Sequence, residues 1–222
     1  MRHSSQTAPS NTTLCRVNYR DAQAAHVLAQ ALIQAIQPHI PQRELVVLSI
    51  GTDRSTGDAL GPLVGTHLEQ WHPPGLPIYG TLDEPVHAMN LKDTITLIHQ
   101  KHPRAFILSI DACLGQYKHI GMISLQAGSL RPGAGVNKRL PEVGDLAFTG
   151  VVNAGGFMEY FVLQNTRLAY VMKMAQVMAY SIHRAWTQLY PKVQQEKPIV
   201  TIRGLEKNMP PPDRKRPDWQ TG

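Results

Sequence analysis

Two short apolar runs constrain the fold of this chain more than any other feature of its sequence. The runs "ELVVLSI" at 44–50 and "RAFILSID" at 104–111 consist mainly of aliphatic residues, which is typical of strands buried on both faces. Amphipathic helical patterns lie around them, at 21–37, 59–71 and 90–102. Strands that alternate with helices of this length predict an α/β fold with three layers, α/β/α, in which helices cover both faces of a mostly parallel sheet.

The remaining periodic segments fit the same architecture. A long helical pattern begins at Met158, runs to about Leu189 and is interrupted near Gln164-Asn165. Asp21 is a suitable N-cap for the first helix. Weaker strand patterns occur at 77–82, 121–126 and 145–152.

The chain is expected to form a single α/β domain over residues 21–207. Residues 1–20 show no strong periodicity and are expected to be a flexible N-terminal segment. Residues 208–222 are basic and rich in proline, so they are expected to be a disordered tail. The formal net charge is +6, but its densest run lies in this tail and no nucleic-acid-binding signature accompanies it. We therefore expect no direct nucleic-acid partner.

Composition also argues against a membrane or secreted protein. Hydrophobic residues make up 42% of the 222 residues, yet no stretch approaches the roughly 18 uninterrupted apolar residues of a membrane span. The N-terminus has no apolar central run of the kind found in secretory signals. Cys15 and Cys113 are far apart and match no metal-finger spacing, which favours two free thiols in a reducing compartment. The expected location is cytoplasmic.

The loops that follow the strands are the places to look for a functional site. In open α/β sheets, ligands bind beyond the carboxyl ends of the strands, where the strand order reverses. In this chain the rule selects the loops after Ile50, Leu82, Ile110 and Val152.

Two of these loops offer a carboxylate. Asp58 lies between the first apolar strand and the next helix, and Asp111 directly ends the second apolar strand. If the strands are neighbours, the two carboxylates can share a proton, and such a pair can activate a water and protonate a leaving group. Alternatively, Asp58 is only the N-cap of its helix and Asp111 only stabilises a turn.

The loop between these features is rich in glycine and polar residues. The stretch "SIGTDRSTGDALGPLVG" at 49–65 lacks the Gly-Lys-Ser/Thr of a P-loop and the G-x-G-x-x-G dinucleotide pattern. Its backbone N–H groups and the following helix start are still able to bind an oxyanion. A solvated polar loop would have the same composition. We expect the following residues to shape the mouth of a substrate site: Asp53, Arg54, Ser55, Thr56 and Gly57.

Three further residues are candidates for accessory roles. Glu84 and His87 follow the third strand with a spacing that can place them on one side of a helical turn. They are expected to contact substrate or orient a catalytic group, with metal binding or simple helix capping as alternatives. Cys113, two residues after Asp111, is a candidate nucleophile with His87 as its base, although free cysteines are more often small buried apolar groups.

Several long motifs resemble one protein family. The stretches "IGTDRSTGDALGPLVG", "GTLDEPVHAMNL", "SIDACLG", "GAGVNKRLPEVGD" and "TGVVNAGGFMEYFVLQNTRL" are similar to those of the YyaC-type spore proteins of endospore-forming bacteria, over about residues 40–170. This family is grouped with putative spore proteases and looks related to germination protease. It resembles the hydrogenase-maturation endopeptidases more distantly.

The resemblance implies a fold and a function. The fold would be a phosphorylase/hydrolase-like α/β/α domain. The function would be that of a sporulation-linked endopeptidase without a cofactor. Asp58 and Asp111 match the segments that carry the catalytic aspartates of germination protease. The implied partner is a protein or peptide substrate, such as a small acid-soluble spore protein, inside the forespore or spore. The alternatives are a non-catalytic binding module that uses the same cleft and a metal-dependent peptidase.

The hydrogenase-maturation enzymes place a histidine in a further segment of a site that holds the nickel of their substrate. The corresponding stretch here, at about 137–145, contains no histidine, so only Glu84 or His87 is left to replace it. We therefore predict no bound metal. The sequence does not fix the oligomeric state, although the Met- and Tyr-rich last helix is able to pair with a second copy.

Overall fold

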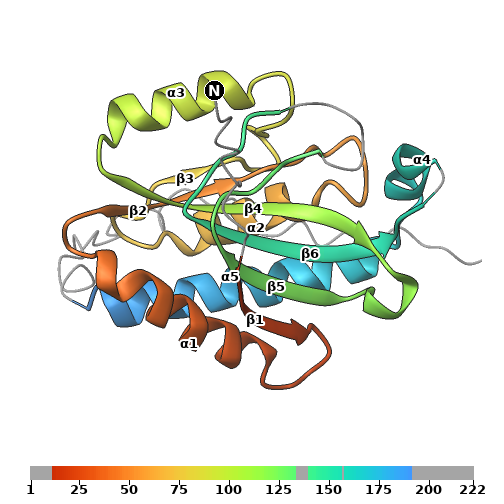
Figure 1. The fold of residues 1–222 in the computed structure, drawn as a ribbon, viewed down its shortest axis with the longest axis horizontal. Coiled ribbons are helices and arrows are strands. Elements are labelled where there is room, and N and C mark those ends of the chain that lie inside the picture. Colours follow the sequence, from red (N-terminus) through yellow and green to blue (C-terminus); the bar gives the residue numbers. More distant parts are fainter. Residues whose placement is uncertain (1–11, 134–139, 157, 192–222) are drawn as a thin grey trace, which may run out of the picture.

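In the computed structural model, six strands of the described residues form one sheet, and helices lie on both of its faces (Figure 1). The structure describes residues 12–133, 140–156 and 158–191. The spatial order of the strands is β1-β5-β6-β4-β2-β3. Their bounds are β1 Thr12–Asn18, β2 Glu44–Ser49, β3 Ile78–Tyr79, β4 Ala105–Gly115, β5 Met122–Ala127 and β6 Leu146–Ala154.

The sheet is mixed, with a parallel central part. β2 pairs in parallel with both β3 and β4, and β4 pairs in parallel with β6. β5 is antiparallel to both of its neighbours, β1 and β6. The predicted α/β fold with a mostly parallel sheet is therefore confirmed, with β5 as the one reversed strand among the described residues.

The helices lie within the predicted ranges, but Asp21 is not the N-cap of the first one, because α1 begins at Ala24 with Gln23 as its N-cap. The expected interruption of the last helical pattern is confirmed, because α4 ends at Gln164 and α5 begins at Leu168. No helix in the described part of the chain is long and apolar enough to cross a membrane. The helices are α1 Ala24–Ile36, α2 Leu60–Trp71, α3 Leu91–Lys101, α4 Glu159–Gln164 and α5 Leu168–Leu189, with short 3-10 turns at Gln37–His39 and Tyr117–His119.

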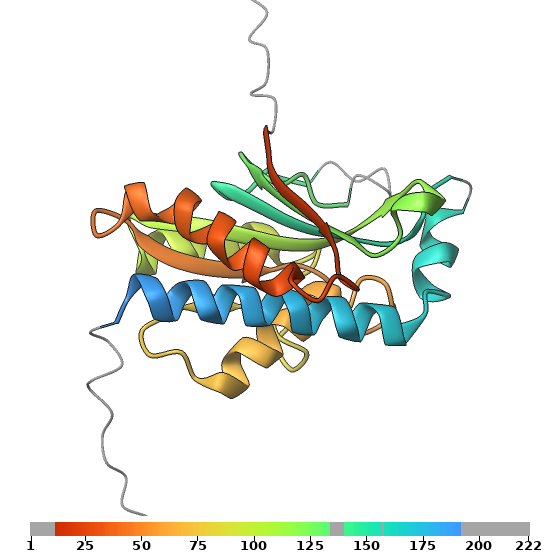
Figure 2. The ribbon, with the colours of Figure 1, turned by 90° about the horizontal axis from the view of Figure 1, so that it is seen from below.

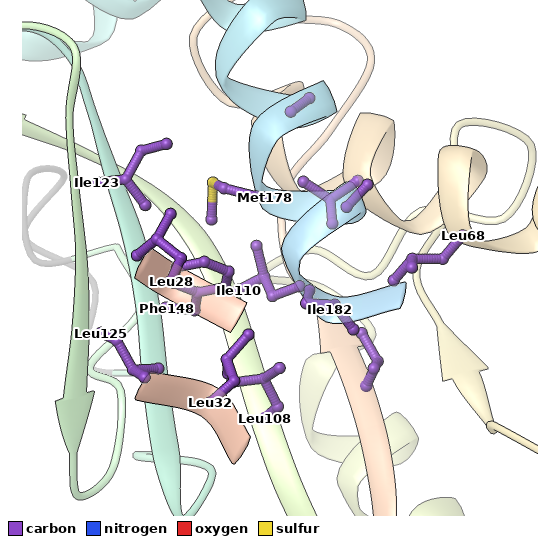
Figure 3. Close-up of a cluster of buried hydrophobic side chains, with 14 of the residues drawn as sticks. Leu28, Leu32, Leu68, Leu108, Ile110, Ile123, Leu125, Phe148, Met178 and Ile182 are labelled. Atoms are coloured by element: carbon purple, nitrogen blue, oxygen red, sulfur yellow. The ribbon is translucent and has the colours of Figure 1, made fainter. Parts of the chain in front are cut away.

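One face of the sheet is covered by α1, α2 and α5. Figure 2 shows α1 and α5 side by side across the strands. In Figure 3, Leu32 of α1 and Met178 of α5 lie among strand residues such as Leu108 and Phe148, all four without solvent exposure. This cluster is the larger of the two cores and holds the sheet to its helical layer.

The opposite face is covered by α3 and by the segment between β5 and β6. Ile98 of α3, Leu130 and Val143 form a second core with the strand residues Ile107 and Ala147. Along β4, even-numbered apolar residues therefore enter the first core and odd-numbered ones the second, as the two-residue period of a strand requires. Helices on both faces confirm the three predicted layers.

Two expectations for the ends of the chain have different outcomes. Residues 12–18 were expected to be part of a flexible segment, but they form β1, which pairs with β5. The alternation of its side chains explains this, because Cys15 and Val17 pack against the first core while Leu14 and Arg16 are exposed. The predicted tail at 208–222 lies outside the described residues.

The chain connections place a crevice between β2 and β4. In the sheet, β3 lies on one side of β2 and β4 lies on the other side of β2. The two connections use α2 on one face of the sheet and α3 on the opposite face. This reversal of strand order is the point at which open α/β sheets bind ligands, so the site is expected at the carboxyl ends of β2 and β4.

Candidate functional site

A cavity of about 430 Å³ lies at these strand ends. It brings together Asp58, His87 and Asp111, which come from three separate segments of the chain. The loop after β2, the start of the segment before α3, the end of β4, the segment after β5 and α4 all contribute to it. Its lining residues are Ile50, Gly51, Thr52, Asp58, His87, Ala88, Asp111, Ala112, Cys113, Leu114, Leu130, Arg131, Pro132, Gly133, Leu140, Thr149, Glu159 and Leu163.

Asp58 is held at the cavity by a tightly folded loop. Thr52 N–H donates to the Asp58 carbonyl at 3.2 Å, which closes the loop on itself. Gly51, at φ +150°, permits this closure, because a Cβ there would lie 1.9 Å from the Asp58 carbonyl oxygen. The N-cap of α2 is Ala59, and no side chain caps the helix. The alternative that Asp58 serves as an N-cap is therefore wrong, and its carboxylate is available to the cavity.

Asp111 lies within β4 rather than at its end. The strand was expected to stop at this residue, but it continues to Gly115 because β6 continues beside it, with Asp111 opposite Thr149. The neighbouring β2 is already at its end here, since its last pair with β4 joins Ser49 and Ile110. Asp111 is thus the first residue of β4 beyond the end of β2, and its Oδ1 accepts a hydrogen bond from Ala112 N–H at 2.8 Å.

Both carboxyl groups have raised pKa values. Burial raises the pKa of Asp111 well above its usual value, the Ala112 N–H acts in the opposite direction, and the charge on Asp58 raises it further. Burial also raises the pKa of Asp58, against a smaller lowering by the Ser55 hydroxyl. The two groups are thus electrostatically coupled, and Asp111 is the one that holds a proton more strongly.

His87 reaches the cavity from the segment between β3 and α3. Gly51 N–H donates to the Val86 carbonyl at 2.8 Å, which fastens this segment beside the loop after β2. His87 N–H donates to Asn90 Oδ1 at 2.8 Å, and His87 Nδ1 accepts from Met89 N–H at 3.2 Å. A neutral imidazole that accepts through Nδ1 carries its proton on Nε2, so His87 is arranged as a hydrogen-bond donor.

Glu84 lies apart from this group. Its side chain is exposed, and it lines a separate surface hollow of about 690 Å³ together with residues such as Glu69 and Lys101. His87 borders both hollows. Glu84 does not line the cavity that holds the two aspartates, and a substrate-binding role for it stays a prediction.

The polar loop predicted to form the substrate mouth lies beside the cavity without lining it. Asp53 and Arg54 are exposed, Ser55 is buried, and Thr56 is half-buried. Gly57 N–H donates to the Leu163 carbonyl at 2.9 Å, so the buried Gly57 packs against α4. Gly51 and Thr52 are the loop residues that enter the cavity before Asp58. Substrate contacts by residues 53–57 stay a prediction.

The environment of Cys113 argues against a thiolate nucleophile. Burial raises the pKa of its thiol to about 11, and the charge on Asp111 raises it in the same direction, while Thr149 and Arg16 lower it. A thiol with this pKa is almost fully protonated at neutral pH, whereas nucleophilic cysteines need the thiolate.

The cavity also contains residues that the sequence patterns do not select, among them Glu159, Thr149 and Arg131. Glu159 lies on α4, just after the Gly155-Gly156 pair that follows β6, so it stands beyond the loop after Val152 that the strand-end rule selects. Thr149 lies within β6 opposite Asp111, and only strand pairing reveals it. Arg131 carries no recognisable pattern in the sequence, and in the structure it forms an ion pair with Glu142 at 2.7 Å.

No group of three or more His, Cys, Asp or Glu side chains suited to a metal ion occurs among residues 12–133, 140–156 and 158–191. Asp58, Asp111 and His87 line the same cavity but do not form such a group. The described part of the chain therefore supplies no set of metal ligands that would support the alternative of a metal-dependent peptidase.

Comparison with known proteins identifies relatives. Residues 16–181 match the family described as "Protein of unknown function (DUF1256)". The chain is 52% identical over 163 residues to "Uncharacterized protein YyaC" of Bacillus subtilis (strain 168), which covers 73% of this chain and 79% of that protein. The resemblance to YyaC-type proteins is therefore confirmed.

A solved structure with a similar arrangement is the crystal structure of a [NiFe] hydrogenase maturation protease, HycI, from Thermococcus kodakarensis KOD1. The sequences are 16% identical, the match covers 70% of this chain and 98% of that chain, and the TM-score is 0.46.

Proposed function

We propose that this chain, which belongs to the DUF1256 family, is a peptidase that hydrolyses a peptide bond with a water held between Asp58 and Asp111. The observation that carries the proposal is the coupling of these two carboxyl groups in one cavity, with both pKa values raised. Such a pair holds one proton between two groups, which supplies a general base and a general acid without further components.

The order of the two pKa values assigns the roles. Asp111 has the pKa raised further, so it carries the shared proton, and Asp58 is the ionised partner. Because Asp111 Oδ1 accepts from Ala112 N–H, Oδ2 is the oxygen that carries the proton and donates it. Asp58 then acts as the base and Asp111 as the acid.

The reaction balances with a single water. The Asp58 carboxylate takes a proton from the water as the water oxygen attacks the carbonyl carbon, while the Asp111 carboxyl group donates a hydrogen bond to the carbonyl oxygen. When the C–N bond breaks, the leaving amine receives a proton from the pair. The product carboxyl group and the amine leave, and the pair keeps one proton for the next cycle.

Two neighbouring residues support this chemistry. His87, with its proton on Nε2, is able to donate a hydrogen bond to an oxygen of the substrate. Glu159, half-buried on α4, supplies a carboxylate for an N–H group of the substrate. Both act on binding and orientation, and the bond-breaking step needs only the two aspartates and water.

The substrate is proposed to be a protein of the spore, on the basis of the sequence motifs shared with the spore protein family. Small acid-soluble spore proteins inside the forespore are the first candidates to test.

The direct test incubates the purified chain with a defined set of purified small acid-soluble spore proteins and identifies new N-termini by mass spectrometry. A single recurrent cleavage site that is lost in Asp58→Asn supports the proposal. Cleavage by Asp58→Asn at the rate of the parent chain would contradict it. Stoichiometric binding without any new N-terminus would instead support a non-catalytic binding module.

A further inference from the structure

The edge of β4 beside the two aspartates has no strand partner among the described residues. β2 covers β4 as far as Ile110, whose carbonyl accepts from Ile50 N–H at 2.7 Å. β4 then continues for five more residues, Asp111 to Gly115, and only β6 pairs with this part, on the other side. The space in which β2 would continue is the cavity itself, since Asp111, Ala112, Cys113 and Leu114 line it.

The direction of the backbone groups on this edge follows from two hydrogen bonds. In a strand, the N–H and C=O of one residue point to the same side, and successive residues alternate between the two sides. The Ile110 carbonyl points to β2, and the Gly115 carbonyl points to the β6 side, where it accepts from Gly155 N–H at 2.8 Å. The pairing of β4 with β6 is irregular between Cys113 and Leu114, where β6 has one extra residue. The carbonyls of Ile110 and Gly115, five residues apart, still point to opposite sides, as unbroken alternation along β4 requires, so Ala112 and Leu114 direct their backbone groups to the open side.

One of these four backbone groups is already hydrogen-bonded within β4. Ala112 N–H is already used, because it donates to Asp111 Oδ1 at 2.8 Å. The Ala112 carbonyl, the Leu114 N–H and the Leu114 carbonyl face the cavity side without a strand partner in the described ranges. The same bond draws the Asp111 carboxylate to the edge, so an added strand would pass directly beside the proposed acid.

We propose that the substrate binds as an extended peptide that adds a strand to the open edge of β4 at Ala112–Leu114. Strand addition to an exposed sheet edge is a general mode of peptide recognition, in which the main chain supplies affinity and alternate side chains supply specificity. This inference rests on the proposed function only where it calls the bound peptide a substrate. Binding of a peptide to the edge of β4 is a separate property from its hydrolysis.

The surroundings of the edge fit a peptide with apolar side chains. Leu130, Leu140 and Leu163 line the cavity together with the edge. Apolar side chains that border a cavity are typical of a surface that receives a protein segment.

The first experiment obtains a ligand and measures binding without turnover. A library of random dodecapeptides with blocked ends is passed over immobilised Asp58→Asn, and the most enriched peptide is synthesised. Each of its backbone nitrogens is then methylated in turn, and binding to Asp58→Asn is measured by fluorescence anisotropy. Strand addition predicts weaker binding at every second position across the bound segment, by about 3- to 10-fold for each lost hydrogen bond.

A pair of protein variants tests the same contact from the other side. Leu114→Pro removes the N–H that faces the open edge, and proline is tolerated at such edge positions. Leu114→Ala removes the same side chain and keeps the N–H. Binding by Leu114→Pro is expected to be about 3- to 10-fold weaker than by Leu114→Ala, because only the hydrogen bond differs.

The outcomes separate this inference from the proposed function. If the peptide binds with alternating sensitivity but the parent chain does not cleave it, strand addition stands and hydrolysis fails. If the parent chain cleaves the peptide and methylation affects binding at all positions or at none, strand addition fails and hydrolysis stands. Failure to enrich any peptide overturns strand addition. A Leu114 amide protected from hydrogen exchange before peptide is added also overturns it, because another segment or a second copy then occupies the edge.

Discussion

Asp58 and Asp111 line one cavity, and the charge on Asp58 raises the pKa of Asp111. The two residues are 53 positions apart in the sequence, since one follows β2 and the other lies within β4. They meet because β2 and β4 are neighbours in the sheet and because β2 ends beside the residue of β4 that precedes Asp111.

Removal of either carboxylate is expected to abolish hydrolysis. Asp58→Asn and Asp111→Asn keep the size of the side chain but remove the base or the acid, and each should lower kcat at least about 100-fold. Asp93→Asn is the matched control, because Asp93 is an exposed residue of α3 outside the cavity. Cleavage of the substrate by mass spectrometry and thermal unfolding of each variant provide the measurements. Retained activity in either of the first two variants would contradict the mechanism.

Hydrolysis is expected to show a bell-shaped dependence on pH. The active form needs an ionised Asp58 and a protonated Asp111, and burial raises the pKa of both groups. Activity should rise as Asp58 ionises, above its usual pKa of 3.8, and fall when Asp111 loses its proton at higher pH. The measurement is kcat/KM across pH 3–9. A profile that is flat over this range would rule out the shared proton.

The stability of the chain is expected to depend on Asp111 with a definite sign. Folding raises the pKa of this group, so the folded chain keeps a proton that the unfolded chain has released. The free energy of unfolding therefore falls as the pH rises above the usual pKa of 3.8, through the folded pKa. Asp111→Asn removes this effect and should be more stable than the parent chain at pH 7, with an advantage that disappears near pH 4.

Thermal unfolding at several pH values checks this sign. For a domain of this size, each kcal/mol corresponds to about 2–4 °C in Tm. Asp93→Asn, which leaves Asp111 in place, should not show the higher Tm at pH 7 that is expected of Asp111→Asn. A Tm for Asp111→Asn that is lower than that of the parent chain at pH 7 would show that the ionised carboxylate is stabilised in the folded state.

Cys113 is expected to react slowly with alkylating reagents. With a pKa of about 11, its thiolate fraction at pH 7.5 is about 300-fold smaller than that of an ordinary cysteine with a pKa of about 8.5. Iodoacetamide labelling of Cys15→Ser, in which Cys113 is the one remaining cysteine, should be correspondingly slow and rise about tenfold per pH unit. Rapid labelling at pH 7.5 would show that the thiol is activated.

Gly51→Ala is expected to displace Asp58. A Cβ at position 51 would lie 1.9 Å from the Asp58 carbonyl oxygen and 2.8 Å from Pro62 Cδ, and the φ of +150° is unfavourable for alanine. The loop after β2 must therefore move, which should lower activity and Tm together. Gly156→Ala is the matched control, because Gly156 has a similar φ of +148° but no described atom lies within 4 Å of the position of its Cβ, so it tests the backbone strain without the clash.

The fold and its strand ends were predictable because they depend on local patterns. The runs at 44–50 and 104–111 are mainly apolar, and both form central strands. The prediction for residues 12–18 is wrong because β1 is a largely exposed edge strand without a clean apolar period, and its pairing with β5 spans more than 100 positions of the sequence. Asp111 was placed at a strand end because the support that β6 gives to β4 cannot be read from a local pattern.

Part of the candidate site was predictable because it, too, depends on local sequence patterns. Asp58 and Asp111 were found because both follow apolar runs, and that rule needs no knowledge of the three-dimensional structure. Thr149 and Arg131 entered only with the structure, since strand pairing and the course of the segment after β5 bring them to the cavity.

The sequence by itself determined the elements, their alternation and the two carboxylates, because helix and strand periods are properties of neighbouring residues. Only the tertiary structure decided which strands are neighbours, because long-range pairing depends on how the layers pack together. That choice placed β2 beside β4, stopped β2 one residue before Asp111 and left the edge at Ala112 and Leu114 open. It also enclosed the two acids, and their burial is the physical cause of the raised pKa values on which the proposed chemistry depends.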